Sequence, residues 1–143
     1  MLALTTTQIN EIAQEIDCGN LCYLNLKTSK LIFTPDFDSN IYADKEFYEE
    51  ELEELENNWG DYAVIEKPSS NVSFNIMVDF TEQLEENNPL RNILFNALNK
   101  KKPFSQFKFE IDNSGEYRQK WFDFKQQKLE NWVVEKFKEI RND

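Results

Sequence analysis

The longest stretch without glycine or proline constrains the fold of this chain most strongly. Neither residue occurs from Glu116 to Arg141, although either would interrupt a helix. Within this stretch, large apolar side chains recur at helical spacing: Tyr117, Trp121, Phe122, Leu129, Trp132, Val133, Phe137 and Ile140. The pattern predicts a long C-terminal helix, and a helix of this kind needs other elements to cover its apolar side.

A different period, of two residues, marks the region after Gly19. In residues 21–26, Cys22, Leu24 and Leu26 alternate with Leu21, Tyr23 and Asn25. A second apolar run, 31–34, follows after a polar turn at 27–30, which has the length of a hairpin turn. A third run of this type, 62–66, is closed by Pro68. The spacing predicts a small three-stranded antiparallel sheet near the N-terminus.

The remaining segments have helical periodicity. We expect helices over 6–17 after an N-cap at Thr5 or Thr6, over the acidic segment 44–56, from Ser69 or Ser70, and from Asn88-Pro89, with a further short element from Phe104. Their apolar positions are Phe47, Tyr48, Leu52 and Leu55; Phe74, Met77, Phe80 and Leu84; Leu90, Ile93, Leu94, Ala97 and Leu98; and Phe104, Phe107 and Ile111. Together they predict an α+β fold: a three-stranded antiparallel sheet packed by about five to six helices, the last of them long. A length of 143 residues is typical of a single domain, which we expect to span 1–143.

The order of these motifs resembles a known family. The resemblance rests on the hairpin Tyr23–Phe33, the acidic insertion, Met77-Val78-Asp79-Phe80, the pair Leu90 and Leu98, the run Lys102–Lys108 and Trp121-Phe122-Asp123-Phe124, and it covers roughly residues 21–140. The chain is similar to an uncharacterised protein family of small bacterial proteins. This resemblance implies a bacterial cytoplasmic protein, and it brings no activity, cofactor or catalytic residue with it.

The sequence contains no histidine, and this absence restricts the chemistry that is available. Ser-His-Asp and Cys-His nucleophiles are excluded, and the two cysteines cannot complete a tetrahedral zinc shell by themselves. Cys18 and Cys22 are separated by three residues, where a redox dithiol usually has two. Cys22 also lies in phase with the apolar residues of its strand, so we interpret it as a small buried side chain.

Three further features favour a cytoplasmic location. No segment approaches the roughly 18 consecutive apolar residues of a membrane span, and Met1–Thr5 has neither the basic nor the apolar region of a secretory signal. Two cysteines are also too few for a disulfide framework.

Charge is distributed unevenly along the chain. The net charge is −11, and residues 1–90 hold 19 of the 27 acidic side chains but only 4 of the 16 basic ones. This asymmetry is typical of a solubility feature, yet it also predicts a binding surface for a basic partner or for a second copy of the chain. The side chains that we expect to contact such a partner are Glu49, Glu50, Glu53 and Glu54 of the acidic segment and the aromatic residues Trp121 and Trp132.

Two alternatives stay open at this point. Asp36 and Asp38 beside the hairpin, with Asp79, would form a carboxylate cluster of the kind used by metal-dependent hydrolases or nucleases, although aspartate after proline is also an ordinary turn residue. Lys100, Lys101 and Lys102 near Phe104 and Phe107 would suit nucleic acid, although the net negative charge opposes a polyanion and both aromatic rings are expected in the core.

We therefore expect a non-catalytic protein-binding or regulatory module without a cofactor. Another protein, or a second copy of the chain, is the expected partner; nucleic acid and membranes are not.

Overall fold

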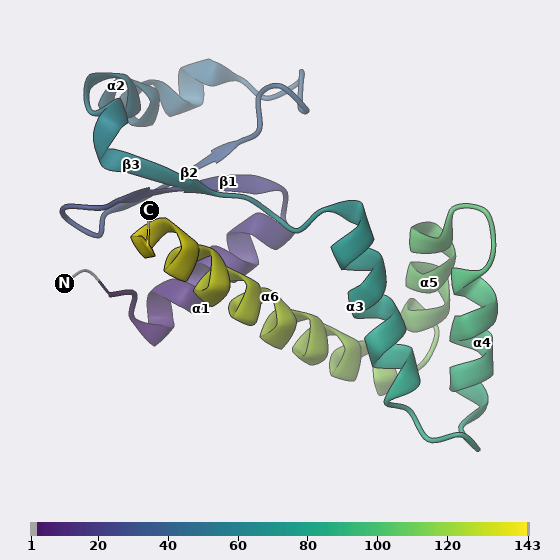
Figure 1. Cartoon of the computed structure of the whole chain (residues 1–143). Helices are drawn as coiled ribbons and strands as arrows, with labels where there is room; N and C mark the ends of the chain where they lie inside the picture. Colours follow the sequence, from purple (N-terminus) through teal and green to yellow (C-terminus); the bar gives the residue numbers. More distant parts are fainter. Residues whose placement is uncertain (1–2, 143) are drawn as a thin grey trace. The chain divides into compact units, whose positions relative to one another are not determined.

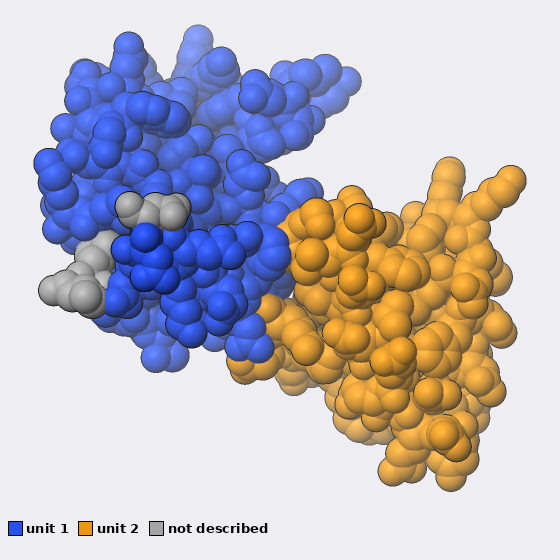
Figure 2. Space-filling model, viewed as in Figure 1, with its two compact units in different colours: residues 1–67, 129–143 blue, residues 68–128 orange. Residues whose placement is uncertain are grey.

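The computed structural model describes residues 3–142, which form two compact units (Figure 2). The first unit contains residues 1–67 and 129–143, and the second contains residues 68–128. In chain order the elements are α1 (Thr6–Asp17), β1 (Asn20–Asn25), β2 (Leu31–Pro35), the 3₁₀ turn η1 (Lys45–Tyr48), α2 (Glu49–Asn57), the 3₁₀ turn η2 (Trp59–Asp61), β3 (Tyr62–Ile65), α3 (Ser70–Glu82), α4 (Pro89–Leu98), α5 (Pro103–Asp112) and α6 (Tyr117–Asn142).

The sheet of the first unit has the strand order β2-β1-β3, and both pairings are antiparallel. Cys22 lies opposite Phe33 on one side and Ile65 on the other, so these three side chains share one face of the sheet. The turn between β1 and β2 is closed by the Asn25 side chain, which accepts hydrogen bonds from the backbone N–H groups of Lys27 and Thr28.

Helices cover both faces of this sheet (Figure 1). On one side lie α1 and the end of α6, and α2 lies on the other. The core on the α1 side is made of residues from the sheet, α1 and α6: Ile12, Ala13, Ile16, Cys22, Ile65, Leu129 and Val133. On the α2 side, Leu55 and Ile32 are buried, and the Tyr62 hydroxyl donates a hydrogen bond to Glu54 Oε2 over 2.8 Å.

The second unit is helical throughout and has a core of its own. Its buried members come from α3, α4, α5 and the start of α6: Ile76, Met77, Phe80, Leu94, Leu98, Phe107, Ile111 and Trp121. Trp121 meets Phe107 edge to face with ring centroids 4.9 Å apart, and it meets Phe80 in the same way at 5.3 Å. Aromatic pairs in this geometry add roughly 0.5–1.5 kcal/mol each beyond the area that they bury.

The sequence-based prediction of an α+β fold with a three-stranded antiparallel sheet and a long C-terminal helix is confirmed. The N-caps at Thr5, Ser69 and Asn88 are confirmed as well, since each of these side chains accepts a hydrogen bond from the first turn of its helix. The expectation of a single domain stays a prediction: α6 continues from the second unit into the first without a break.

Three apolar residues expected on covered helix faces are exposed instead: Phe47, Ile93 and Phe104. Phe47 lies in η1, because the acidic segment forms a 3₁₀ turn and then a helix where one helix is predicted. Tyr48 between them has φ −118° and ψ 20°, which are not helical values, so the face of α2 does not extend to Phe47. Ile93 and Phe104 lie beside buried residues of α4 and α5 but are only partly covered; Phe104 meets Phe74 of α3 edge to face, with ring centroids 6.4 Å apart.

None of the helices within residues 3–142 combines the length and the apolar character that crossing a membrane requires.

The capping box of α1 generates a stability prediction. The Gln8 N–H donates to Thr5 Oγ1 over 3.1 Å, and the Thr5 N–H donates to Gln8 Oε1 over 3.0 Å. We expect Thr5→Ala to lower the free energy of unfolding by about 1 kcal/mol, because it leaves an N-terminal donor of the helix without its acceptor. Urea unfolding followed by circular dichroism measures the loss. Thr7→Ala is the control, since Thr7 is exposed inside the same helix; an equal loss for both variants would contradict the capping explanation.

The two thiols should react very differently. Burial, reinforced by the nearby carboxylates Glu11 and Glu15, raises the pKa of Cys22 to about 12, whereas Cys18 is exposed. We expect an aromatic disulfide reagent at pH 8 to modify one thiol quickly and the second only on unfolding, and Cys18→Ser to remove the fast phase. Because the thiol of Cys22 keeps its proton longer in the folded state, its contribution to stability should fall as pH rises above about 9, towards 12. Two fast thiols would show that β1 is not packed as described.

Candidate functional site

A groove lies along each outer edge of the sheet. The groove beside β2, which we call the acidic groove, has a volume of about 400 Å³ and lies between β2 and the segment formed by η1 and α2. The groove beside β3, which we call the tryptophan groove, has a volume of about 290 Å³ and lies between β3 and the last turns of α6. Both belong entirely to the first unit.

The register determines which backbone groups point into these grooves. The N–H of Asn25 donates to Lys30 and the N–H of Leu26 donates to Asp61, which identifies the hydrogen-bonded pairs of the two ladders. In an antiparallel ladder the residues between such pairs turn their N–H and C=O groups away from the neighbouring strand. The outward groups therefore belong to Leu31 and Phe33 of β2 and to Tyr62, Val64 and Glu66 along β3; the N–H of Tyr62 is already used, since it donates to the carbonyl of Trp59.

The acidic groove combines a free strand edge with carboxylates and aromatic rings. Its lining residues are Lys30, Leu31, Ile32, Phe33, Phe47, Tyr48, Glu50, Glu51 and Glu54. Phe47 is 82% exposed, while Tyr48 is held in place by an edge-to-face contact with Phe37, with centroids 5.8 Å apart. The lining contains three carboxylates, those of Glu50, Glu51 and Glu54, and one ammonium group, that of Lys30. The groove therefore has a net negative charge, which attracts cations.

Two of these carboxylates differ in how they are held. Glu54 accepts from the hydroxyl of Tyr62, and burial is the main reason that the pKa of this phenol is raised; Tyr62 therefore stays a donor at neutral pH. The Oε2 atom of Glu51 is buried, and none of the groups described in residues 3–142 donates a hydrogen bond to it. A buried carboxylate oxygen without a donor is costly to the fold.

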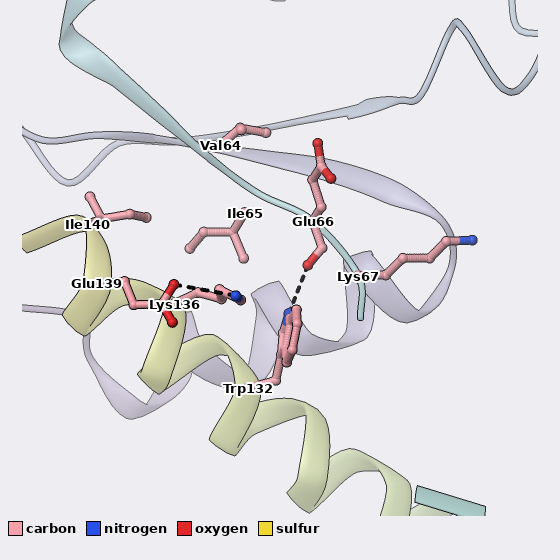
Figure 3. Close-up of a pocket in the computed structure, with 8 residues that line it drawn as sticks. All are labelled: Val64, Ile65, Glu66, Lys67, Trp132, Lys136, Glu139 and Ile140. Carbon is pink, nitrogen blue, oxygen red and sulfur yellow. Dashed lines mark hydrogen bonds and ion pairs between the residues drawn. The ribbon is translucent and has the colours of Figure 1, made fainter. Parts of the chain in front are cut away.

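The tryptophan groove is shown in Figure 3. Its lining residues are Val64, Ile65, Glu66, Lys67, Trp132, Lys136, Glu139 and Ile140. The indole N–H of Trp132 donates to the carbonyl of Glu66 over 2.9 Å and so fixes the end of β3 to α6. Lys136 lies 4.3 Å from the centre of the Trp132 ring and forms an ion pair with Glu139 at 3.3 Å.

The residues predicted to bind a partner are placed in different environments. Glu50 and Glu54 line the acidic groove, whereas Glu49 and Glu53 are exposed on α2 outside it. Trp132 lines the tryptophan groove. Trp121, by contrast, is only 8% exposed and belongs to the core of the second unit, so it is not part of either groove.

The carboxylates of the alternative hypothesis belong to different units, Asp36 and Asp38 to the first and Asp79 to the second. Asp36 closes a turn by accepting from the Asp38 N–H and from Ser39 Oγ, which is the ordinary role of aspartate after proline. Asp79 lies in α3 of the other unit, where Lys128 Nζ is 4.0 Å from it. Within residues 3–142 no three side chains of histidine, cysteine, aspartate or glutamate are grouped closely enough to hold a metal ion.

Lys100, Lys101 and Lys102 form the exposed connection between α4 and α5. Lys102 has a left-handed backbone with φ 57° and precedes Pro103, the first residue of α5. Phe107 is buried as expected, but Phe104 beside this loop is exposed. These three lysines line neither groove.

Three features of these sites were not predicted from the sequence: the exposure of Phe47, the burial of Glu51 Oε2 and the outward backbone of Val64. The β-strand pattern contains a signal for the third, because strands at the edges of a sheet always have such groups. The first two depend on how η1 and α2 lie over the sheet, which the local pattern does not contain.

Comparisons with known proteins identify a family but name no activity. A protein of Pseudomonas aeruginosa from the UPF0158 group is 28% identical over 132 residues, which is 91% of this chain and 80% of the relative. No solved structure matches the chain. Residues 2–142 match the sequence model of UPF0158, which is described as an uncharacterised protein family. This match spans nearly the whole chain, which therefore belongs to the UPF0158 family.

Proposed function

We propose that this protein is a non-catalytic binding module whose acidic groove takes an extended, basic segment of a partner protein. One observation carries the proposal: a free strand edge, an exposed aromatic ring and unneutralised carboxylates all line the same groove.

The strand edge supports an extended partner. The outward N–H and C=O groups of Leu31 and Phe33 have no backbone partner within residues 3–142. A peptide that lies beside β2 can pair with these groups and add a strand to the sheet, a recurring mode of peptide recognition. Main-chain pairing supplies affinity for an extended segment, and the side chains of the groove then select its sequence.

The charge of the groove supports a basic partner. Glu50, Glu51 and Glu54 line it, and only Lys30 opposes them. Lysine or arginine from a partner would pair with these carboxylates. Arginine suits this pairing best, because its planar fork can contact two carboxylate oxygens at once.

Phe47 supplies the apolar contact. A phenylalanine with 82% of its surface in water contributes almost nothing to the stability of the fold, whereas covering it with a partner removes apolar area from solvent. Aromatic residues at the edge of such a groove are typical binding determinants.

The proposed setting is the bacterial cytoplasm. Cys18 and Cys22 are both free thiols, as in proteins of a reducing compartment. In this setting the protein would regulate its partner by occupying a basic segment, without a cofactor.

A displayed library of short peptides tests the proposal. We expect the protein to enrich peptides in which lysine or arginine alternates with apolar residues, and salt to weaken their binding. The double variant Phe47→Ala/Glu50→Lys should weaken such a peptide about tenfold or more, which is about 1.4 kcal/mol. Both side chains are exposed, so thermal unfolding should not change.

The matched control is Phe109→Ala/Glu86→Lys, which makes the same chemical changes at exposed positions of the second unit. It should bind the selected peptides as the wild type does. Equal weakening by both variants would reduce the effect to net charge, and absence of any basic enrichment would refute the acidic groove as a peptide site.

A further inference from the structure

The second edge of the sheet carries an inference that is independent of the acidic groove. We infer that β3 is the interface of a two-fold symmetric homodimer, in which the β3 strands of two copies pair antiparallel around Val64 and join two three-stranded sheets into one.

The backbone of β3 leaves this edge open to pairing. Ala63 and Ile65 exchange hydrogen bonds with β1, so Val64 turns both its N–H and its C=O outward. Among residues 3–142 neither group has a hydrogen-bond partner, whereas the next outward carbonyl, that of Glu66, is already satisfied by Trp132. A two-fold axis at Val64 would let the two valines exchange both hydrogen bonds.

The middle of this edge carries no charged side chain. Proteins usually protect an edge strand with charges, proline or a bulge; β3 itself consists of Tyr62, Ala63, Val64 and Ile65, and the nearest charges, Asp61, Glu66 and Lys67, lie at its two ends. Val64 is 44% exposed, and the nearby Trp59 is 64% exposed beside Tyr23, the residue that lies opposite Val64 in the sheet. An apolar edge of this kind is typical of an interface.

The two edges of the sheet differ in whether each can pair with the same edge of a second copy of the chain. Two β2 edges would bring the carboxylates of two acidic grooves together and repel. At β3, a register centred on Val64 places Lys67 of each copy opposite Asp61 of the other. Asp61 has one cation, Lys27, at 3.1 Å, and within residues 3–142 no cation is placed against it from the β3 side. The charges at β3 are therefore self-complementary, as a two-fold interface requires.

The same arrangement also determines where the tryptophan grooves of the two copies lie in the dimer. Antiparallel strands related by this axis keep the same faces on the same side, so the α6 helices of both copies lie on one side of the joined sheet. The open groove between β3 and α6 then faces its symmetry copy, and Ile140, Lys136 and Glu139 become available for contact across the axis.

Sedimentation velocity over a concentration series tests the inference. We expect the wild type to form dimers and Val64→Lys to shift the protein to monomers, because it places two like charges directly opposite each other. Val64→Thr is the matched control: it keeps the β-branched shape without charge and should stay dimeric. A wild type that remains monomeric throughout, or a Val64→Lys variant that dimerises as the wild type does, would overturn the inference.

Cross-linking gives a second readout if Val64→Lys disturbs the fold. Hydrogen-bonded antiparallel residues have Cα atoms about 5.5 Å apart, within the range of a disulfide. In a Cys18→Ser background, Val64→Cys should form a covalent dimer on mild oxidation, whereas Lys30→Cys at the other edge should not. Absence of the cross-link at position 64 would overturn the proposed register. Because Phe47→Ala/Glu50→Lys should remain dimeric, the outcome does not depend on the acidic groove.

Discussion

The pairing of β1 with a strand on each side is the constraint on which the first unit depends. Its alternate residues bond to β2 and to β3, so from Cys22 to Asn25 the central strand is paired on both sides. Helices can cover the two faces of such a sheet, and they do so here with α1 and the end of α6 on one face and α2 on the other. They do not satisfy its edges, and a sheet of three strands always has two.

The two edges have become chemically different because different helices lie beside them. Next to β2, the turn η1 and the helix α2 contribute carboxylates and an exposed phenylalanine, which suit a basic chain. Next to β3, α6 contributes Trp132, which holds the strand end, and a balanced pair of charges in Lys136 and Glu139. The two proposed sites rest on this difference between the edges of one small sheet.

The long helix α6 has two roles that its sequence shows only in part. Its first turns complete the core of the second unit through Trp121, and its last turns complete the core of the first unit through Leu129 and Val133. The aromatic residues of this helix look alike in the sequence. Trp121 is a core residue and Trp132 is a groove residue because different elements pack against each of them.

The sequence by itself determined the elements of this fold, because helix and strand periods, caps and turns are local properties. The alternation around Cys22, the caps at Thr5, Ser69 and Asn88, and the uninterrupted helix after Gly115 all follow from residues that are close together in the chain. The sequence also directed attention to the acidic segment, since charge density is a matter of composition. What only the tertiary structure decided is exposure and burial: that Phe47 faces water, that Glu51 Oε2 is buried without a donor among residues 3–142, and that Trp121 is buried in a core while Trp132 lines a groove. These properties depend on which elements pack against one another, and that choice is made by contacts between residues far apart in the chain.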